Sequence, residues 1–359
     1  MNRRNQILSG LLALQLILIA VLFWPGRGAN ASAAALFPDL TVNDIQAMTI
    51  QQGEQQVQVA RGGDGWVLPG ADDFPVTALT ATDVISKVLQ IDTRRLVADN
   101  TSSHARLQVT AEDAQRTVTL ETKTGDELTL LVGSSPSFRS TNVRRGDSDA
   151  VYLTSSIQAT DLRTDYGNWV DTSYLAIPQS DMQSITVENA QTSLTFTKVS
   201  TDTWTLADLT ADETFNQNNL TSLLTRFSGL NMVKPLGKSA QPEYGMDNPA
   251  ATVTIVHQPA GGSAETTTLT VGAAPLDNGN YVVKSSASDY YVEVASFSVE
   301  NLINRGRADY LTQPEAGDGA IDATGGITNT EFISGFDEIT ATVPVTGSES
   351  ITATEAVTP

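Results

Sequence analysis

The feature that most constrains the fold of this chain is an internal repeat. Asp44–Ile50 matches Asp181–Val187 at an offset of 137 residues, and both segments keep apolar residues at alternating positions. Further landmarks follow in the same order at slightly larger offsets, beginning with Trp66 and Trp204, which lie 138 residues apart. Duplication followed by small insertions in loops leaves such a pattern. The sequence therefore predicts two tandem copies of one module.

Each copy has the same pattern of expected elements. Alternating apolar residues predict strands, for example over 117–120 and 127–132, and the turn between these two favours a hairpin. Apolar residues at helical spacing predict a helix over 78–90, matched in the second copy by a helix that contains Leu220 and Phe227. Short turns between neighbouring strands favour antiparallel pairing. The predicted fold class is α+β, with a transmembrane helix followed by two tandem repeats of a mostly antiparallel sheet with two helices each, and a disordered acidic tail.

The first thirty residues contain a long apolar segment. Ile7–Trp24 is 18 residues long and has only Ser9 and Gln15 as polar residues. As a helix it would be roughly 27 Å long, which is close to the hydrocarbon thickness of a bilayer. Arginines precede the segment, so the positive-inside rule predicts a cytoplasmic N-terminus and an extracytoplasmic body. A cleaved signal peptide, with cleavage at the small residues 29–35 and a secreted body, is the alternative.

These features divide the chain into five parts. Residues 312–359 contain eight acidic residues and no lysine or arginine, a composition typical of disorder. The divisions are a cytoplasmic stub with an anchor or signal peptide over 1–24, a linker over 25–38, the first repeat over 39–177, the second repeat over 178–312 and the tail over 313–359.

The charge and cysteine content exclude several classes of protein. With the three arginines of residues 1–30 set aside, 18 basic residues remain against 41 acidic ones, a formal charge of −23. A body this acidic repels nucleic acid and anionic lipid headgroups. The absence of cysteine excludes disulfides, thiolate metal sites, a cysteine nucleophile and a lipoprotein anchor.

Motifs for catalysis are not found in the sequence. The chain has two histidines, His104 and His257, which are too few for a multi-histidine metal site and argue against a histidine-based triad. Phosphate-binding loops, a nucleophile elbow and calcium-loop spacings do not occur. The sequence predicts a protein that is not an enzyme, with no catalytic, cofactor-binding or metal-binding residues.

Five residues are candidates for contact with a partner or ligand. Trp66 and Trp204 occupy equivalent positions in the two copies and could stack on a ligand, although a tryptophan at the end of a strand more often closes its own core. Tyr244, Gly245 and Asp247 belong to a sharp turn, Tyr-Gly-Met-Asp-Asn-Pro, whose structural role is to join two strands.

These landmarks together resemble the bacterial domain-of-unknown-function family numbered 4340. The tryptophan strand, the leucine-bearing helix, the turn at Tyr244–Pro249 and the strand that ends at Gly272 carry the resemblance, which covers roughly 40–311 as two copies. The first copy departs from the pattern, with Ala-Arg-Leu at 105–107 where the second has Tyr-Gly-Met. Members of this family look like single-span envelope proteins, often encoded beside an ABC-type permease, its ATPase and an auxiliary protein similar to a gliding-motility component.

The resemblance implies a non-enzymatic accessory or scaffold protein of an ABC-type transport or envelope complex. The expected partners are the membrane, through residues 7–24, the permease and ATPase, and auxiliary envelope proteins, but no nucleic acid. The alternative is an envelope protein that binds or processes carbohydrate with an acidic cleft between the two copies.

Overall fold

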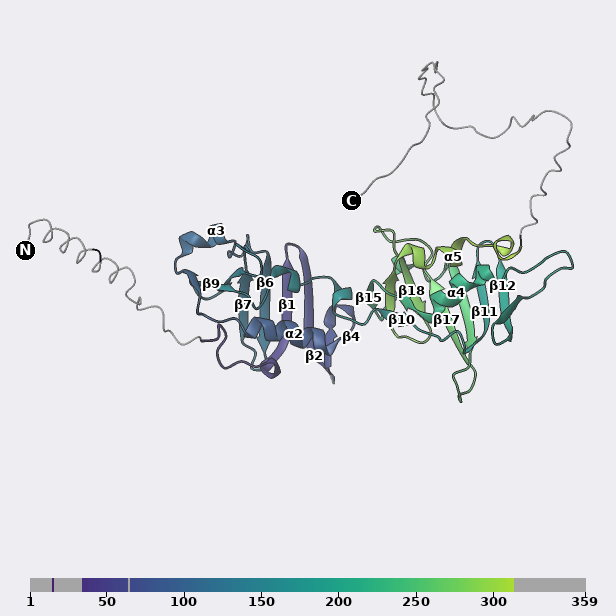
Figure 1. Ribbon diagram of the computed structural model, residues 1–359, viewed down its shortest axis with the longest axis horizontal. Coiled ribbons are helices and arrows are strands. Elements are labelled where there is room, and N and C mark those ends of the chain that lie inside the picture. The colour runs from purple at the N-terminus through teal and green to yellow at the C-terminus, as the bar shows by residue number, and fades with distance from the viewer. Residues whose placement is uncertain (1–14, 16–33, 64, 313–359) are drawn as a thin grey trace, which may run out of the picture. The chain divides into compact units, whose positions relative to one another are not determined.

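A computed structural model describes residues 15, 34–63 and 65–312 of the chain. Two large antiparallel sheets dominate these residues (Figure 1). Nine strands of the described chain form the first sheet, in the order β4-β3-β2-β1-β6-β7-β8-β9-β5. The strands of the first sheet are β1 (Ile45–Gln52), β2 (Gln55–Gly62), β3 (Gly65–Leu68), β4 (Phe74–Val76), β5 (Leu96–Ala98), β6 (Arg116–Thr122), β7 (Glu127–Val132), β8 (Thr141–Arg145) and β9 (Val151–Thr154).

The second sheet contains eight strands of the described chain in the order β13-β12-β11-β16-β17-β18-β19-β15. Its strands are β11 (Met182–Asn189), β12 (Ser193–Ser200), β13 (Thr203–Leu206), β15 (Lys234–Gly237), β16 (Ala251–His257), β17 (Glu265–Val271), β18 (Tyr281–Ser285) and β19 (Tyr291–Val294). A separate two-stranded sheet pairs β10 (Ser173–Leu175) with β14 (Leu230–Asn231). The two large sheets have the same spatial order of strands, with β2-β1-β6-β7-β8-β9 in the first matching β12-β11-β16-β17-β18-β19 in the second.

Alternation of apolar and polar residues builds both sheets. In β16 the side chains at positions 251, 253, 255 and 257 are buried while those between them are half-exposed. Strand β6 shows the same pattern, with Val118 and Leu120 buried. The register brings Met48 of β1 opposite Leu120, and Ile185 of β11 opposite Ile255. Cross-strand apolar pairs of this kind fix the register, because a slip by one residue would turn the buried side chains to solvent.

The helices are few, and the longer ones are amphipathic. The α-helices of the described residues are α2 (Ala78–Leu89), α3 (His104–Leu107), α4 (Asn218–Ser228) and α5 (Glu300–Asn304). Short 3₁₀ turns are η1 (Val42–Asp44), η2 (Pro69–Ala71), η3 (Thr101–Ser103), η4 (Ala159–Asp161), η5 (Tyr166–Asn168), η6 (Pro242–Tyr244), η7 (Ser296–Ser298) and η8 (Arg307–Tyr310). One face of α2 is buried, at Ala81, Val84, Ile85 and Val88, and one face of α4 is buried at Leu220, Leu223, Leu224 and Phe227.

The predicted fold class, α+β with a transmembrane helix ahead of two repeats that have two helices each, is wrong. The described chain is made mostly of antiparallel sheets, and its helices are few and short. The amphipathic helices give strong periodic signals in the sequence, but they contribute far fewer residues than the strands do. Antiparallel pairing itself, expected from the short turns, is found throughout both sheets.

Within the described residues, no helix is both long enough and apolar enough to cross a bilayer. The apolar segment 7–24 lies outside the described residues except for Gln15, and the acidic tail over 313–359 lies wholly outside them.

The first described residues after the N-terminal segment pack onto the first sheet. Leu36 and Phe37, which the sequence places in the linker, are buried in the core. The Leu36 amide donates to the Ile91 carbonyl at 2.7 Å, and Arg145 donates to the Leu36 carbonyl at 3.2 Å while its guanidinium lies 5.5 Å from the centre of the Phe37 ring. The chain is therefore fixed to the sheet from about residue 34 onward.

Candidate functional site

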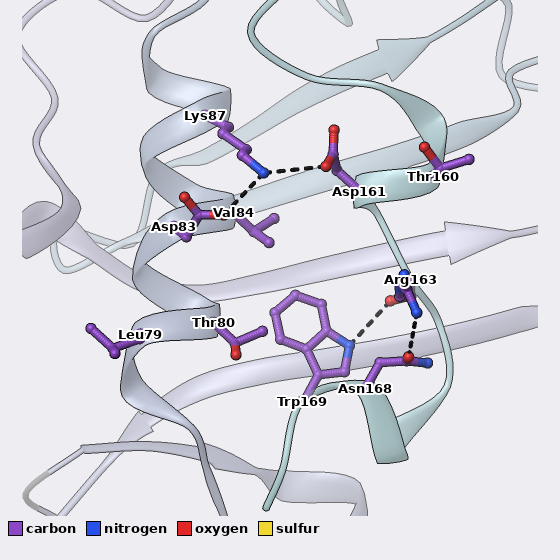
Figure 2. Close-up of a pocket in the computed structure, with 10 residues that line it drawn as sticks. All are labelled: Leu79, Thr80, Asp83, Val84, Lys87, Thr160, Asp161, Arg163, Asn168 and Trp169. Carbon is purple, nitrogen blue, oxygen red and sulfur yellow. Dashed lines mark hydrogen bonds and ion pairs between the residues drawn. The ribbon is translucent and has the colours of Figure 1, made fainter.

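A groove beside α2 is the candidate site of the molecule (Figure 2). Helix α2 forms one wall, and the segment that follows β9 forms the other. The groove has a volume of about 400 Å³. It is lined by Leu79, Thr80, Asp83, Val84, Lys87, Thr160, Asp161, Arg163, Asn168 and Trp169.

Lys87 joins the two walls of the groove. Its Nζ lies 3.0 Å from Asp83 Oδ2, one helical turn earlier, and 3.2 Å from Asp161 Oδ1 on the opposite wall. The hydrogen bond with Asp83, and then the one with Asp161, raises the pKa of Lys87 above its ordinary value. An acid and a lysine four residues apart on a helix lie on the same face, so the sequence spacing places the first of these pairs.

Asp161 is itself held by the turn that carries it. Its Oδ2 accepts the backbone N–H of Gln158 at 2.8 Å, which caps η4, while its Oδ1 faces Lys87. One carboxylate therefore fixes the turn and the ion pair at once. A side chain held by two partners has little freedom left, so Asp161 helps to fix this wall of the groove.

Trp169 forms the floor of the groove. Its side chain is 1% exposed, and its indole N–H donates to the Arg163 carbonyl at 3.1 Å (Figure 2). The Arg163 guanidinium in turn donates to Asn168 Oδ1 at 2.7 Å. The Trp169 carbonyl accepts the Thr77 amide at 2.8 Å, which ties this loop to the start of α2. Packing and hydrogen bonds therefore define both walls.

The rim of the groove combines apolar and polar groups. Leu79 is 81% exposed, and Arg163 and Asn168 are also exposed. Such a surface can bind a short segment of another molecule through one apolar contact and several hydrogen bonds. Both carboxylates in the groove are already bound to Lys87, so neither is free to act as a separate acid or base.

Every carboxyl group of the described chain that has a shifted pKa has a pKa below its ordinary value. The strongest case is Glu213, whose pKa falls to about 2 because Arg307 donates hydrogen bonds to it. A general acid in carbohydrate cleavage needs the opposite shift. The lowered carboxyls of the described chain are Asp44, Asp92, Asp147, Glu213 and Glu293.

The two candidate tryptophans lie in the core of separate sheets. Trp66 of β3 is buried beneath the Arg61 guanidinium, which lies 4.0 Å from the centre of its ring. Trp204 of β13 is buried as well, and its backbone N–H donates to Gln217 at 2.8 Å. Neither side chain offers an open face to a ligand in this structure, and the structure does not bring the two together.

Tyr244, Gly245 and Asp247 lie in the turn that leads into β16. Tyr244 is buried, and its ring packs against that of Tyr291 with 5.4 Å between the centres. Gly245 has a φ of 62°, and a Cβ there would lie 2.8 Å from the Ala273 amide nitrogen. Asp247 is exposed beyond the turn. Tyr244 and Gly245 thus fix the chain close to the end of β17, and the five candidate residues form no common site.

The groove beside α2 was missed by sequence reasoning. The spacing of Asp83 and Lys87 is a detectable signal, because it places an ion pair on one helical face. Asp161, Arg163 and Trp169 follow in the chain some 70 residues or more after that pair. The strands that lie between these two segments in the sequence fold into the sheet that brings them together, and no local sequence pattern predicts this contact.

The histidines have structural partners. Nε2 of His104 lies 2.9 Å from the Asp149 carbonyl, and Nε2 of His257 lies 3.0 Å from the Thr267 hydroxyl. Across residues 34–63 and 65–312, no group of three or more histidine, aspartate or glutamate side chains is close enough to hold a metal ion.

Comparison with known proteins gives one match. No curated protein and no solved structure is similar to the chain. A family model, described as a domain of unknown function (DUF4340), matches residues 66–249, from the tryptophan strand of the first sheet to the turn that precedes β16. This match covers more than half of the chain. The chain therefore belongs to the domain-of-unknown-function family DUF4340.

Proposed function

We propose that the chain is a non-enzymatic accessory or scaffold protein on the outer face of the cell membrane, and that it serves an ABC-type transport or envelope complex. The groove beside α2 carries this proposal. It is a surface with an exposed apolar residue, Leu79, and its two carboxylates are paired with Lys87. In this role the groove binds an extracytoplasmic segment of a partner protein.

The chemistry of the groove supports binding over catalysis. Lys87 is held by Asp83 and Asp161, so it is not a free nucleophile, and both acids are paired with it. A peptide segment can add a hydrogen-bonding group to Arg163 or Asn168 and an apolar side chain to Leu79 without disturbing these pairs. Exposed apolar residues next to polar groups are typical of transient protein contacts.

The proposed location follows from the apolar segment 7–24. Arg3 and Arg4 precede it, which favours a cytoplasmic N-terminus and a single-pass protein with its body outside the cytoplasm. Secretion after signal cleavage is the alternative. The transporter association rests on the family resemblance, and the common strand order of the two large sheets supports a relation of both to the family as tandem copies.

The second candidate, a carbohydrate-binding cleft between the copies, is less favoured. A cavity of about 370 Å³ is lined by residues of both halves, including Gln55, Asp165 and Lys234. Asp165 is the one carboxylate in its lining, and Lys234 pairs with Glu293 at 3.3 Å. A glycosidase requires two carboxyl groups across the bond that is cleaved.

Co-purification from detergent tests the accessory role. The full-length chain is expected to recover an ABC-type permease and its ATPase, and a Leu79→Glu variant is expected to lose them, because it places a charge on the apolar rim. Phe138→Glu is the matched control, since Phe138 is also an exposed apolar residue of the first sheet but lies in the loop between β7 and β8. Recovery of the chain alone would contradict the proposal, and equal losses in both variants would contradict the assignment to the groove.

A further inference from the structure

A second cleft lies at the edge of the first sheet, beside β5. It has a volume of about 510 Å³, and its lining residues are polar except for Leu153. Two arginines and a run of hydroxyl side chains are its main features. The lining residues are Gln90, Asp92, Arg94, Arg95, Leu153, Thr154, Ser155 and Ser156.

The cleft carries positive charge on an otherwise acidic protein. Arg94 pairs with Asp92, with 2.5 Å between Nη2 and Oδ2, and the Arg94 side chain remains 67% exposed. Within the described chain, the Arg95 side chain has no hydrogen-bonding or ionic partner. Two guanidinium groups and one carboxylate leave one net positive charge. Guanidinium and hydroxyl groups are the donors that proteins use to bind phosphate.

Exposed apolar side chains directly follow the two arginines. Leu96 and Val97 of β5 are 55% and 42% exposed. Strand β5 is the outermost strand of the sheet and pairs only with β9, so no other strand of the described chain pairs with its outer edge. Basic and apolar groups side by side are the combination that binds at a membrane interface, where headgroups meet the acyl chains.

The point at which the chain joins the sheet lies next to this surface. Ala35 forms a bridge with Asp92, and the Thr93 amide donates to the Ala34 carbonyl at 3.0 Å. Nine residues, 25–33, separate Ala34 from the apolar segment, and they include Arg27 and no acid. Nine residues can span at most roughly 30 Å. A chain anchored through 7–24 therefore holds the β5 edge close to the bilayer.

We propose that this surface docks on the bilayer, with the phosphate of an anionic lipid headgroup in the cleft between Arg94, Arg95 and Ser155–Ser156, and with Leu96 and Val97 at the interface. The inference rests on the proposed membrane attachment and adds a defined orientation to it. The overall negative charge repels the body from the same surface, whereas the positive charge of the cleft is attracted to it.

The chain contains no cysteine, so one introduced thiol reports on one position. The full-length Val97→Cys protein carries an environment-sensitive fluorophore and is reconstituted in vesicles of phosphatidylcholine alone or mixed with phosphatidylglycerol. Brominated acyl chains quench a probe that touches the bilayer. Val199→Cys is the matched control, because Val199 is a strand valine of the second sheet and is 60% exposed.

Quenching at position 97 is expected in vesicles that contain phosphatidylglycerol, with little at position 199. Each of Arg94→Gln and Arg95→Gln is expected to lower the ratio of docked to undocked protein about fivefold. The variant Arg139→Gln removes the same single charge from an exposed site in the loop between β7 and β8 and should leave the ratio unchanged.

Three results of the quenching experiment would overturn the inference, and two results of vesicle flotation would as well. The first is equal quenching at positions 97 and 199. The second is quenching at position 97 that changes neither with the phosphatidylglycerol content nor with substitution of the two arginines. The third is energy transfer between labelled copies in place of quenching, which would show that the edge pairs with a second copy. A protein that fails to float with any vesicle would refute the membrane attachment itself, and this inference with it. A protein that floats without quenching at position 97 refutes the docking surface alone.

Discussion

Strands β6 and β16 occupy corresponding places in the two sheets, and each is preceded by a short helical turn that ends in a left-handed residue. Before β6 the turn ends at Leu107 and Gln108, and Gln108 has a φ of 58° and ψ of 43°. Before β16 it ends at Tyr244 and Gly245, and Gly245 has a φ of 62° and ψ of 30°. Gln108 therefore holds the left-handed conformation that glycine holds in the second sheet.

Each turn also contacts a glycine that ends the next hairpin. A Cβ on Gly133 would collide with the Leu107 carbonyl oxygen, and one on Gly272 would collide with the Tyr244 carbonyl oxygen. The apparent mismatch between residues 105–107 and 244–246 in the sequence thus disappears, because Leu107 occupies the place of Tyr244. The comparison teaches that the close backbone contact is kept in both sheets while the side chains around it differ.

The strongest test of this correspondence is a substitution of each contact glycine. Gly133→Ala and Gly272→Ala are each expected to lower the free energy of unfolding by about 3 kcal/mol, because rigid backbone must move away from the new methyl group. Urea denaturation of the full-length chain in detergent measures the loss. Gly65→Ala and Gly229→Ala are controls in the two halves, since a Cβ there meets nothing within 4 Å, and they should change it by less than about 0.5 kcal/mol. A large loss for only one of the contact glycines would break the correspondence.

Substitutions at the two left-handed positions should change the stability of the protein in opposite directions. Gly245→Ala is expected to destabilise by about 2 kcal/mol, because a side chain disfavours this conformation and the Cβ would press on Ala273. Gln108→Gly is expected to stabilise by about 0.5 kcal/mol, since relief of strain slightly exceeds the entropy that glycine adds to the unfolded chain. Thermal unfolding of both variants measures the two shifts, and shifts of the same sign would contradict the comparison.

The basic residues near the ends of α2 and α4 have different partners. The effect of salt on the stability that each residue contributes should therefore differ. Lys87 binds carboxylates of Asp83 and Asp161, whereas Arg226 donates to the neutral Ser298 hydroxyl and Phe297 carbonyl at 3.3 and 3.4 Å. Lys87→Met should destabilise by about 0.5 kcal/mol at low salt and by less at high salt. Arg226→Met should show no such salt dependence. A salt-independent effect at Lys87 would show that the ion pairs contribute nothing to the groove.

A smaller, pH-dependent effect is expected at Glu213 in the second half. Its folded pKa of about 2 lies below the ordinary value of 4.5, because Arg307 donates hydrogen bonds to it. A lowered pKa contributes stability above about pH 4.5, and this contribution is lost as the pH falls toward 2. Glu213→Gln should therefore flatten the acid side of the profile of melting temperature against pH. NMR titration of the Glu213 carboxyl checks the same claim, and a midpoint near 4.5 would contradict it.

The strands were predictable because their chemistry is local. The expected hairpin over 117–132 appears as β6 and β7, and the helix expected over 78–90 appears as α2, Ala78–Leu89. Alternation of apolar residues in a strand, and their helical spacing in a helix, indicate which face is buried. Burial of that face stabilises the element. The predicted fold class was wrong because it gave the helices too large a share of the structure. A helix of 12 residues is as conspicuous in the sequence as a sheet, but it contributes far fewer residues.

The candidate site depended on contacts that no local pattern records. Asp161 reaches Lys87 across 74 residues of sequence, and Trp169 binds the start of α2 through Thr77. Likewise, Gln108 gave no sign of its left-handed conformation, which is usually signalled by glycine or asparagine. The two tryptophans, in contrast, were nominated because they occupy equivalent positions in the two copies, and both lie in the core, as their positions at the ends of strands favoured.

Each large sheet draws all of its strands from one continuous stretch of the chain. The last strand of the first sheet ends at Thr154, before β11 of the second begins at Met182. During synthesis or export from the N-terminus, the first sheet therefore has every strand available while the second is still being delivered. Domains completed in this order fold one after the other and are less exposed to mispairing of their strands.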